Sequence, residues 1–451
     1  MNRAAVVFLI LTAAALPRMA LASPPGRPDS TSIEAKLDAY LSPYVAQKDF
    51  GGAVLIADGD NVLVRKAYGM ANYALSVPNT PNTRFGIASL TKTFTAAAVI
   101  MLQESGRVQL DDRLDKFLPD YPKGNKITLR HLLGHASGVP NPDYDSIFYK
   151  RLNPDSLIET FSKKPLDFEP GTSDRYSNAG YVLLARVVEK ASGQRFEQFL
   201  HDRIFAPLGM SDTGFLDQPR IILNLASAYV PGPAPLGLEN AAARDPSTLF
   251  GSGCLYSTVD DLYRWAKAVR SDRLFKRTAL KYPFGWGRRK QYGHSYIEQS
   301  GLIPGFMSHL MVYLDQPRYV VCLSNIESGL FNRLDHDLTN IAFGGDPVQN
   351  RSVPRASTVD PQVLAGYVGR YRGPFFRLRV IREDGRLYSN FDESPARSYL
   401  VPISADELYM RSNFAIIRAT RDSNGRVSEL AIQWEGAGEP MKLPRMKETG
   451  A

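Results

Sequence analysis

Two kinds of hydrophobic pattern alternate along the first three quarters of the chain. Residues 51–59 form a continuous apolar run that ends in a turn, and residues 61–66 follow it, which predicts a hairpin of two strands. Residues 93–104 and 179–192 carry apolar side chains at helical spacing and a glycine follows each segment, which predicts two helices. The apolar run at 319–325 predicts a strand buried on both faces. This mixture predicts an α+β domain with a mostly antiparallel sheet flanked by helices.

The pattern changes after residue 345. Residues 346–359 are polar, contain prolines and lack periodicity, as expected of a linker between a first domain (32–345) and a second domain (360–447). The second domain carries short apolar segments separated by turn signals such as Asp384-Gly385, with no helical pattern between them. The six strands predicted there are residues 376–381, 386–391, 398–403, 407–411, 414–419 and 427–434. We therefore expect a small barrel or sandwich.

The N-terminal segment, residues 1–22, has the pattern of a secretory signal peptide. A short basic start precedes the apolar run at 4–16, and small residues precede the bond between Ala22 and Ser23, where we expect cleavage. The alternative is a membrane anchor, but a proline and an arginine interrupt the segment and it falls short of the ~20 apolar residues that a span needs. We expect a periplasmic or secreted protein.

Composition and charge narrow the range of functions. The chain has 451 residues, of which 44% are hydrophobic and 22% charged, as in ordinary globular proteins, so a disordered or fibrous chain is excluded. Removing the signal peptide takes two of the 54 basic residues and leaves 52 against 46 acidic ones, with no lysine or arginine block. We expect no nucleic-acid partner and no stable membrane span.

The cysteines and histidines do not indicate a metal or redox centre. Cys254 and Cys322 are too few for a disulfide framework or a four-thiolate metal site, and their pairing stays open. His131 and His135 share a helix face, but without a glutamate between them or a third ligand we expect packing and hydrogen-bonding roles. The absence of HExxH, GxSxG and glycine-rich phosphate-loop motifs disfavours zinc hydrolases, α/β-hydrolases and nucleotide-binding enzymes. We expect no metal and no organic cofactor.

One candidate nucleophile remains, at the start of the first predicted helix. Ser89 and Lys92 are three residues apart, so on a helix the hydroxyl and the amine share a face. A serine is a weak nucleophile until a base removes its proton, and a lysine becomes that base only if desolvation lowers its pKa. The helix N-terminus also favours negative charge and offers free N–H groups. Alone, the motif fits a capping serine followed by a solvated lysine equally well.

A second motif shifts the balance toward catalysis. Tyr176 and Asn178 lie 87 and 89 residues after Ser89, immediately before the second predicted helix. A tyrosine beside a lysine can be held as phenolate or share its proton, acting as base in acylation and as acid toward the leaving group. The Asn178 amide would orient the substrate. The alternative for this motif is a core tyrosine with a capping asparagine.

With these motifs the chain resembles the serine β-lactamase-like superfamily, in the branch of class C β-lactamases, D-alanyl-D-alanine carboxypeptidases, D-aminopeptidases and β-lactamase-fold esterases. Further matching segments follow in the family's order: residues 127–138, 207–210 and 253–262, and then 364–371, which is similar to the lipocalin-like β-barrel appended to many members. The resemblance implies a β-lactamase/transpeptidase-like domain with an additional all-helical region. It also implies that Ser89 is acylated, Lys92 is its partner, Tyr176 is the general base and acid, and Asn178 contacts a substrate amide.

The third motif of the family departs from its usual form. Members carry Lys or His, then Thr or Ser, then Gly on an active-site strand, whereas this chain has Gln299-Ser300-Gly301. The resemblance implies an oxyanion hole formed by the N–H groups of Ser89 and Leu302, which does not need the cation. The positive charge itself is lost, so a substrate carboxylate is neutralised less well.

These observations favour an exported serine hydrolase that forms an acyl-enzyme on Ser89. We expect an esterase or a D-amino-acid amidase or peptidase with poor β-lactamase activity, acting on a small-molecule or peptidoglycan-derived substrate. The alternative within enzymes is a penicillin-binding DD-peptidase or β-lactamase. The alternative outside enzymes is a non-catalytic homologue that binds the cell wall. The oligomeric state is not predicted.

Four further residues have a functional and a structural interpretation. His294 would supply the histidine of the family only in another strand register, and no glycine follows it at the required spacing, so we expect a strand-edge histidine. Arg244 and Arg270 could bind a carboxylate, but we expect solvated positions. We expect Trp286 in the core.

Overall fold

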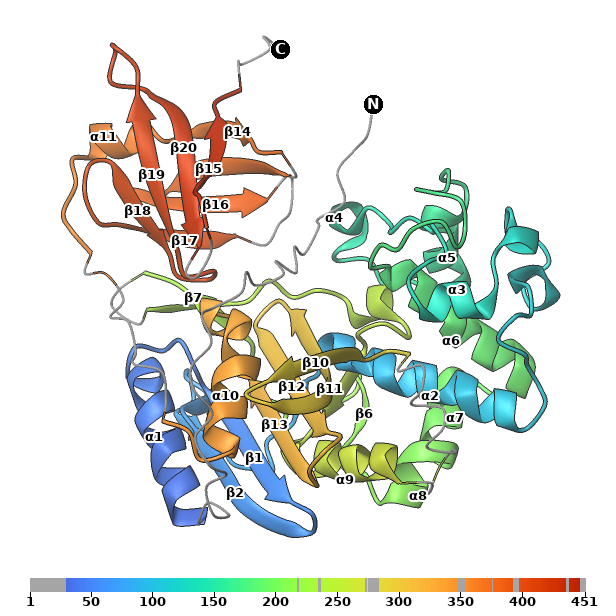
Figure 1. Ribbon diagram of the computed structural model, residues 1–451. Coiled ribbons are helices and arrows are strands. Elements are labelled where there is room, and N and C mark those ends of the chain that lie inside the picture. The colour runs from blue at the N-terminus through green and yellow to red at the C-terminus, as the bar shows by residue number, and fades with distance from the viewer. Residues whose placement is uncertain are drawn as a thin grey trace.

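The computed structural model (Figure 1) describes residues 30–216, 219–233, 237–271, 274, 284–346, 354, 356–374, 376–391, 397–434 and 438–446. The predicted signal peptide and its cleavage site, most of the predicted linker and residue 447 lie outside these residues.

A six-stranded antiparallel sheet forms the centre of the first domain. Its strand order is β10-β11-β12-β13-β1-β2. The strands are β10 (Gly287–Gln291), β11 (His294–Ile303), β12 (Phe306–Tyr313), β13 (Arg318–Ser324), β1 (Gly52–Asp58) and β2 (Asn61–Tyr68). The predicted hairpin and the predicted buried strand are β1–β2 and β13, in neighbouring positions of this sheet. The expected antiparallel α+β architecture is confirmed.

The alternation of side chains along the strands divides the domain into two hydrophobic layers. On one face, Val54 and Met311 pack in a layer with α1 (Ser30–Ala46) and α10 (Leu334–Ala342). On the other face, Leu55 and Leu310 belong to the layer that includes α9 (Val259–Arg270) and α2 (Thr91–Glu104). In Figure 1 the sheet lies between α1 and α10 on one side and α2 and α9 on the other.

A helical part lies beside the sheet and packs on α2. Its helices are α3 (Leu129–Leu133), α4 (Tyr144–Ile147), α5 (Pro154–Ser162), α6 (Asn178–Ser192), α7 (Phe196–Leu200) and α8 (Ala206–Leu208), with a π-helical turn at His201–Phe205. The two helices predicted from periodicity are confirmed as α2 and α6, which pack against each other. Short strands form three small sheets, in the orders β3-β4, β5-β9-β6 and β7-β8. They are β3 (Met70–Asn72), β4 (Val77–Pro78), β5 (Phe85–Gly86), β6 (Gly214–Phe215), β7 (Tyr229–Pro231), β8 (Leu238–Asn240) and β9 (Leu255–Ser257).

The C-terminal part is an eight-stranded antiparallel barrel in which each strand pairs with the next along the chain. The strands are β14 (Gly369–Arg372), β15 (Arg377–Glu383), β16 (Arg386–Phe391), β17 (Ser398–Pro402), β18 (Glu407–Met410), β19 (Ala415–Arg421), β20 (Val427–Trp434) and β21 (Met441–Pro444), preceded by α11 (Pro361–Ala365). A bridge between Tyr371 and Arg445 nearly closes the barrel. The six predicted strands are present; the prediction missed β14 and β21, which are only four residues long, and the short helix α11.

The barrel contacts the first domain through a buried ion pair. Arg411 is 9% exposed and donates to the carboxylate of Asp49, which is fully buried, at 2.7 Å, and to the backbone oxygen of Gln47 at 2.6 Å. Nearby, the Tyr388 hydroxyl donates to a carboxylate oxygen of Glu239 at 2.8 Å. Within the described residues, the helices are all too short or too polar to cross a bilayer.

Candidate active site

Ser89 lies on a 3₁₀ turn, Ala88–Leu90, that leads directly into α2. Strand β5 pairs with β9, and the Ile87 N–H donates to the Leu255 oxygen at 2.9 Å, so the turn is anchored to a small sheet. Ala88 has a φ of 48°, in the left-handed region that residues other than glycine rarely adopt. The surrounding contacts therefore hold a strained backbone beside the candidate nucleophile, as is common at functional sites.

The structure brings three of the predicted site residues together at one point. The Nζ of Lys92 lies 3.0 Å from the Ser89 Oγ, and the Tyr176 hydroxyl donates to the same Oγ at 2.7 Å. Lys92 reaches Ser89 because the two residues share a helix face, and Tyr176 reaches it from the loop before α6. A hydroxyl, an amine and a phenol from segments 87 residues apart thus meet within hydrogen-bond distance.

Lys92 lies in an environment that disfavours its charge. Its side chain is 1% exposed, and besides Ser89 its Nζ donates to the Ser252 oxygen at 2.8 Å. No carboxylate among the described residues forms an ion pair with it, and it lies 4.8 Å from the centre of the Tyr176 ring. Burial lowers the pKa of Lys92 well below its ordinary value. A neutral amine beside a serine hydroxyl can accept its proton.

Tyr176 is poised as a proton donor rather than as a phenolate. The residue as a whole is 42% exposed, but its hydroxyl donates to the Ser89 Oγ. Burial raises the pKa of the Tyr176 phenol above its ordinary value, and the hydrogen bond with Ser89 offsets only part of that effect. Of the two states that the sequence leaves open, the geometry favours the neutral phenol, because a neutral Lys92 does not stabilise a phenolate.

The loop that carries Tyr176 is fixed by hydrogen bonds to neighbouring side chains. The Ser177 N–H donates to Nδ1 of His135 at 3.1 Å, and the His135 ring lies 4.7 Å from the Tyr176 ring. Burial and the nearby Lys92 lower the pKa of His135 to about 3, so the imidazole is neutral. His131 accepts the Thr128 N–H at 3.3 Å in a capping box at α3. The packing and hydrogen-bonding roles predicted for both histidines are confirmed.

Asn178 begins α6 and is partly buried beside a tyrosine that sequence reasoning missed. Burial raises the pKa of Tyr144 to about 12, against the smaller effects of Arg244 and of the Asn178 amide. The Arg244 guanidinium stacks on the Tyr144 ring at 4.3 Å and is partly buried, so its predicted solvated position is wrong. The Tyr144 phenol adds to the rise in the pKa of Tyr176, after burial as the main cause. No spacing motif links Tyr144 to the other residues.

The Gln299-Ser300-Gly301-Leu302 segment lies on β11, beside the Ser89 turn. A side chain at position 301 would place its Cβ 2.5 Å from the Ile87 oxygen and 2.8 Å from the Ser89 nitrogen, so Gly301 faces the nucleophile. Because side chains alternate along a strand, Gln299 lies on the same face. Its amide nitrogen donates to the Ser300 oxygen at 2.9 Å. A neutral amide therefore occupies the place of the family's cation.

Ser308 was missed by sequence reasoning. It pairs with Gly301 in the β11–β12 register, and its hydroxyl donates to the Ile87 oxygen at 2.7 Å. It ties the central sheet to the turn that carries Ser89. Only the strand register reveals it.

Replacing Gly301 with alanine should lower kcat/KM by about 100-fold, since an added Cβ would clash with backbone atoms and move the Ser89 turn, and a displacement of about 1 Å is enough for such a loss. Steady-state kinetics on an activated ester would measure it. Gly438→Ala is the matched control, because no atom lies within 4 Å of its Cβ position. Activity within threefold of wild type in Gly301→Ala would contradict the close approach of β11 to Ser89.

The other candidates lie elsewhere. His294 is five residues before Gln299 on β11, about 17 Å along the strand, where it contacts Asp315 and stacks on Phe343. Arg270 bonds to the backbone oxygens of Tyr313 and Gln316. Trp286 packs against the core, as predicted. Cys254 and Cys322 are buried and free, so they do not pair.

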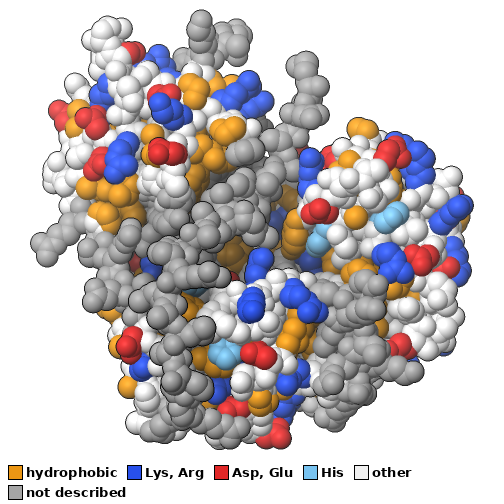
Figure 2. Space-filling model, viewed as in Figure 1, with side chains coloured by type: hydrophobic (Ala, Val, Ile, Leu, Met, Phe, Trp, Pro, Cys, Tyr) orange, Lys and Arg blue, Asp and Glu red, His pale blue; other side chains and the backbone are white. Residues whose placement is uncertain are grey.

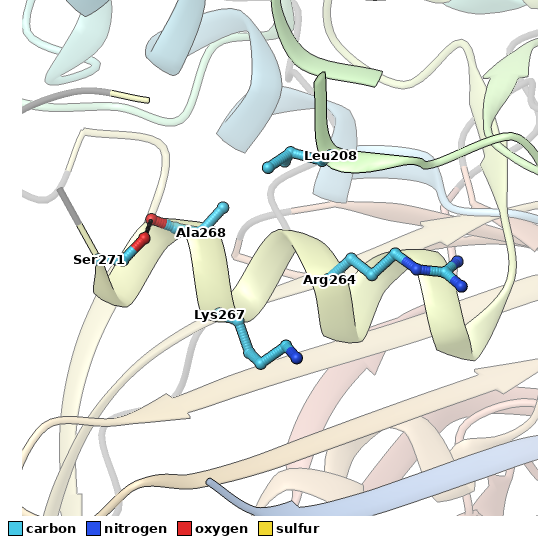
Figure 3. A pocket seen from close by; sticks show the side chains of 5 residues that line it. All are labelled: Leu208, Arg264, Lys267, Ala268 and Ser271. Atoms are coloured by element: carbon cyan, nitrogen blue, oxygen red, sulfur yellow. Dashed lines mark hydrogen bonds between the residues drawn. The ribbon is translucent and has the colours of Figure 1, made fainter. Parts of the chain in front are cut away.

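A pocket of about 330 Å³ lies between α8 and α9 and shares no residue with the Ser89 cluster. Figure 3 shows its lining side chains: Leu208, Arg264, Lys267, Ala268 and Ser271. Both of its cations form ion pairs, Arg264 with Asp261 and Lys267 with Asp60. Within the described part of the chain, no group of three or more His, Cys, Asp or Glu side chains could hold a metal ion.

A family model and two similar proteins each match most of the chain. A family model described as Beta-lactamase matches residues 37–342. Penicillin-binding protein 4* of Bacillus subtilis (strain 168) is 29% identical over 406 residues, which cover 80% of this chain and 88% of that protein. Teichoic acid D-alanine hydrolase of Staphylococcus aureus is 26% identical over 329 residues, 70% of this chain and 80% of that protein.

Solved structures agree with this result. A D-stereospecific amidohydrolase from Streptomyces sp. superposes with a TM-score of 0.55 and 26% identity, over 66% of this chain and 95% of that chain. The resemblance inferred from the motifs and the expected fold class are confirmed.

Proposed function

The chain belongs to the beta-lactamase family, and from this we propose that it is an exported serine hydrolase that forms an acyl-enzyme on Ser89 and acts on small esters or amides of D-amino acids. One observation carries the proposal: the Ser89 Oγ is held between the buried amine of Lys92 at 3.0 Å and the Tyr176 hydroxyl at 2.7 Å. The export part of the proposal rests on the pattern of residues 1–22.

The two flanking groups support distinct roles. In acylation, neutral Lys92 accepts the Ser89 proton as Oγ bonds to the substrate carbonyl carbon. The N–H groups of Ser89 and Leu302 stabilise the oxyanion. When the tetrahedral intermediate collapses, Tyr176 donates its proton to the leaving oxygen or nitrogen, and protonated Lys92 restores it. In deacylation, water attacks the acyl carbon, loses its proton to the same pair, and Ser89 regains its proton as it leaves.

Gln299 argues for substrates without a free carboxylate next to the scissile bond. β-Lactams and peptides ending in D-alanine both carry such a carboxylate, and the neutral amide of Gln299 does not neutralise it. An ester or a primary amide of a D-amino acid has no free carboxylate at this position, so its binding does not require a cation. The names of two similar proteins, a teichoic acid D-alanine hydrolase and a D-stereospecific amidohydrolase, agree with this choice.

A penicillin-binding DD-peptidase or β-lactamase is the second candidate. The observation that favours it is the similarity to penicillin-binding protein 4*, which covers 80% of this chain. In that case a cation other than residue 299 must bind the substrate carboxylate. Arg244, partly buried with its guanidinium 4.3 Å from the centre of the Tyr144 ring, is a candidate for this cation.

Activity profiling with acyl-enzyme mapping tests the proposal. The purified protein is assayed with p-nitrophenyl esters, D-alanine amide, a D-alanyl-D-alanine peptide and nitrocefin. We expect esters and the D-amino-acid amide to exceed nitrocefin in kcat/KM by at least about 100-fold, since an unpaired buried charge in the complex is costly. Quenched reactions should show the acyl mass on the peptide that contains Ser89. An adduct on another residue, or none, would exclude the mechanism; rapid nitrocefin turnover would favour the second candidate.

A further inference from the structure

Four arginines form a cluster on the outer face of the C-terminal barrel. Arg370 and Arg372 project from β14, and Arg377 and Arg379 from β15; all four are exposed, whereas the alternate residues Tyr371 and Leu378 point into the barrel core. In Figure 1 these strands lie on the side of the barrel nearer α4, and Figure 2 shows Lys and Arg side chains gathered at that edge.

The register places these arginines directly opposite one another. Arg370 pairs with Arg379, and Arg372 pairs with Arg377. Directly opposite side chains have Cβ atoms about 4.5–5.5 Å apart, and the next outward position along a strand is about 7 Å away. The four side chains therefore form a compact two-by-two array of positive charge. Like charges directly opposite on a sheet are destabilising, so folding itself does not favour this arrangement.

Two other arginines of the barrel have acidic partners. Arg418 on β19 lies directly opposite Glu407 on β18, and the two form an ion pair at 2.9 Å. Arg421 pairs with Asp406 at 2.7 Å. By contrast, none of the four clustered side chains makes an ion pair or a side-chain hydrogen bond within the described residues. The cluster differs from these two pairs in that arginine faces arginine across the strands.

Protection of an exposed sheet edge does not account for the cluster. Charged residues on an edge strand discourage pairing with another chain, and β14 is the first strand of the sheet. However, β15 is paired on both sides, with β14 and β16, and still carries two of the four arginines. The charges of β15 need another explanation.

We propose that the β14–β15 face of the barrel binds a linear polymer whose units are joined by phosphodiester groups and carry no bases. Guanidinium groups bind phosphate oxygens in a bidentate manner, and an array of four matches the repeated negative charges of such a chain. Aromatic platforms for base stacking are absent from the outward positions of the described strands β14 and β15, which argues against nucleic acid. The apolar residues between these arginines, Tyr371 and Leu378, point into the barrel core, so the array itself offers no apolar side chain that could anchor in a membrane.

The test compares two charge-matched variants of the full-length protein. The cluster variant carries Arg370→Gln, Arg372→Gln, Arg377→Gln and Arg379→Gln. The control variant carries Arg107→Gln, Arg175→Gln, Arg195→Gln and Arg203→Gln, which remove the same charge from exposed positions of the first domain. Binding of poly(glycerol phosphate) is measured by fluorescence anisotropy, with single-stranded DNA and vesicles of phosphatidylglycerol and phosphatidylcholine as separate probes.

Wild type and the control variant should bind poly(glycerol phosphate) with a slope of log K against log salt near −3, as expected for about four phosphate contacts between about 50 and 200 mM salt. The cluster variant should lose about 100-fold in affinity at the lower salt and most of that slope. Its hydrolysis of p-nitrophenyl esters should be unchanged, which reports an intact fold. Equal binding by all three proteins, no binding by wild type, or a preference of wild type for the vesicles or the DNA would overturn the proposal.

Discussion

Replacing Lys92 with methionine should abolish most of the hydrolytic activity and, at the same time, make the protein more stable. Lys92 is 1% exposed and holds the Ser89 hydroxyl at 3.0 Å without a carboxylate partner in the described part of the chain. Loss of a general base of this kind lowers kcat by about 10⁴-fold. Methionine has a similar length and fills the site without an amine, so KM should change little. Steady-state kinetics on an activated ester measures the effect.

The stability part of this prediction follows from the lowered pKa of Lys92. Between the lowered pKa of the folded state and the ordinary lysine pKa near 10.4, Lys92 is protonated in the unfolded chain and neutral in the folded chain. The free energy of unfolding of the wild type should therefore rise with pH over this range. Lys92→Met removes this dependence, so its advantage, about 1–3 kcal/mol at neutral pH, should shrink as the pH rises toward the ordinary lysine value. Urea unfolding at several pH values would measure it.

Lys190→Met, on the exposed end of α6, is the control and should alter neither quantity. A Lys92→Met protein that keeps more than a tenth of the activity would exclude Lys92 as the base. If the free energy of unfolding of Lys92→Met at neutral pH is lower than that of wild type, burial of the Lys92 amine does not destabilise the protein.

The sequence predicts local relationships in the site better than distant ones. Ser89 and Lys92 could be joined because helical spacing alone brings residues three apart onto one face. The loss of positive charge at position 299 could also be predicted, because it follows from the residue type, Gln, alone. Tyr176 lies far along the chain; its residue type and its place before a predicted helix suggested a catalytic role, and the family resemblance paired it with Ser89.

Residues that depend on register or loop packing could not be predicted. Ser308 reaches the Ser89 turn because it pairs with Gly301, and that pairing follows from the β11–β12 register rather than from any motif. Tyr144 is the first residue of the short helix α4, and the packing of that helix, which no motif marks, sets its position. The strands β14 and β21 were also missed, although β18, which has the same length of four residues, was predicted.

Replacing Arg411 with methionine should destabilise the protein by about 3–5 kcal/mol, because it leaves a buried carboxylate without its partner. Arg411 donates to the Asp49 carboxylate at 2.7 Å and to the backbone oxygens of Gln47 at 2.6 Å and Gly237 at 3.2 Å, so it joins the barrel to two segments of the first domain. Burial raises the pKa of Asp49 despite the arginine, and without the arginine this pKa should rise further.

The pH dependence separates a lost ion pair from lost packing. As pH falls through the raised pKa of Asp49 in the variant, the carboxyl becomes neutral, so the deficit of Arg411→Met relative to wild type should shrink. The double variant Asp49→Asn/Arg411→Met should lose less than Arg411→Met alone, since no charge remains buried. Arg418→Met, in an exposed pair, should change the free energy of unfolding by less than about 1 kcal/mol. If Arg411→Met unfolds at the wild-type urea concentration, or its deficit is independent of pH, the ion pair does not hold the barrel against the first domain.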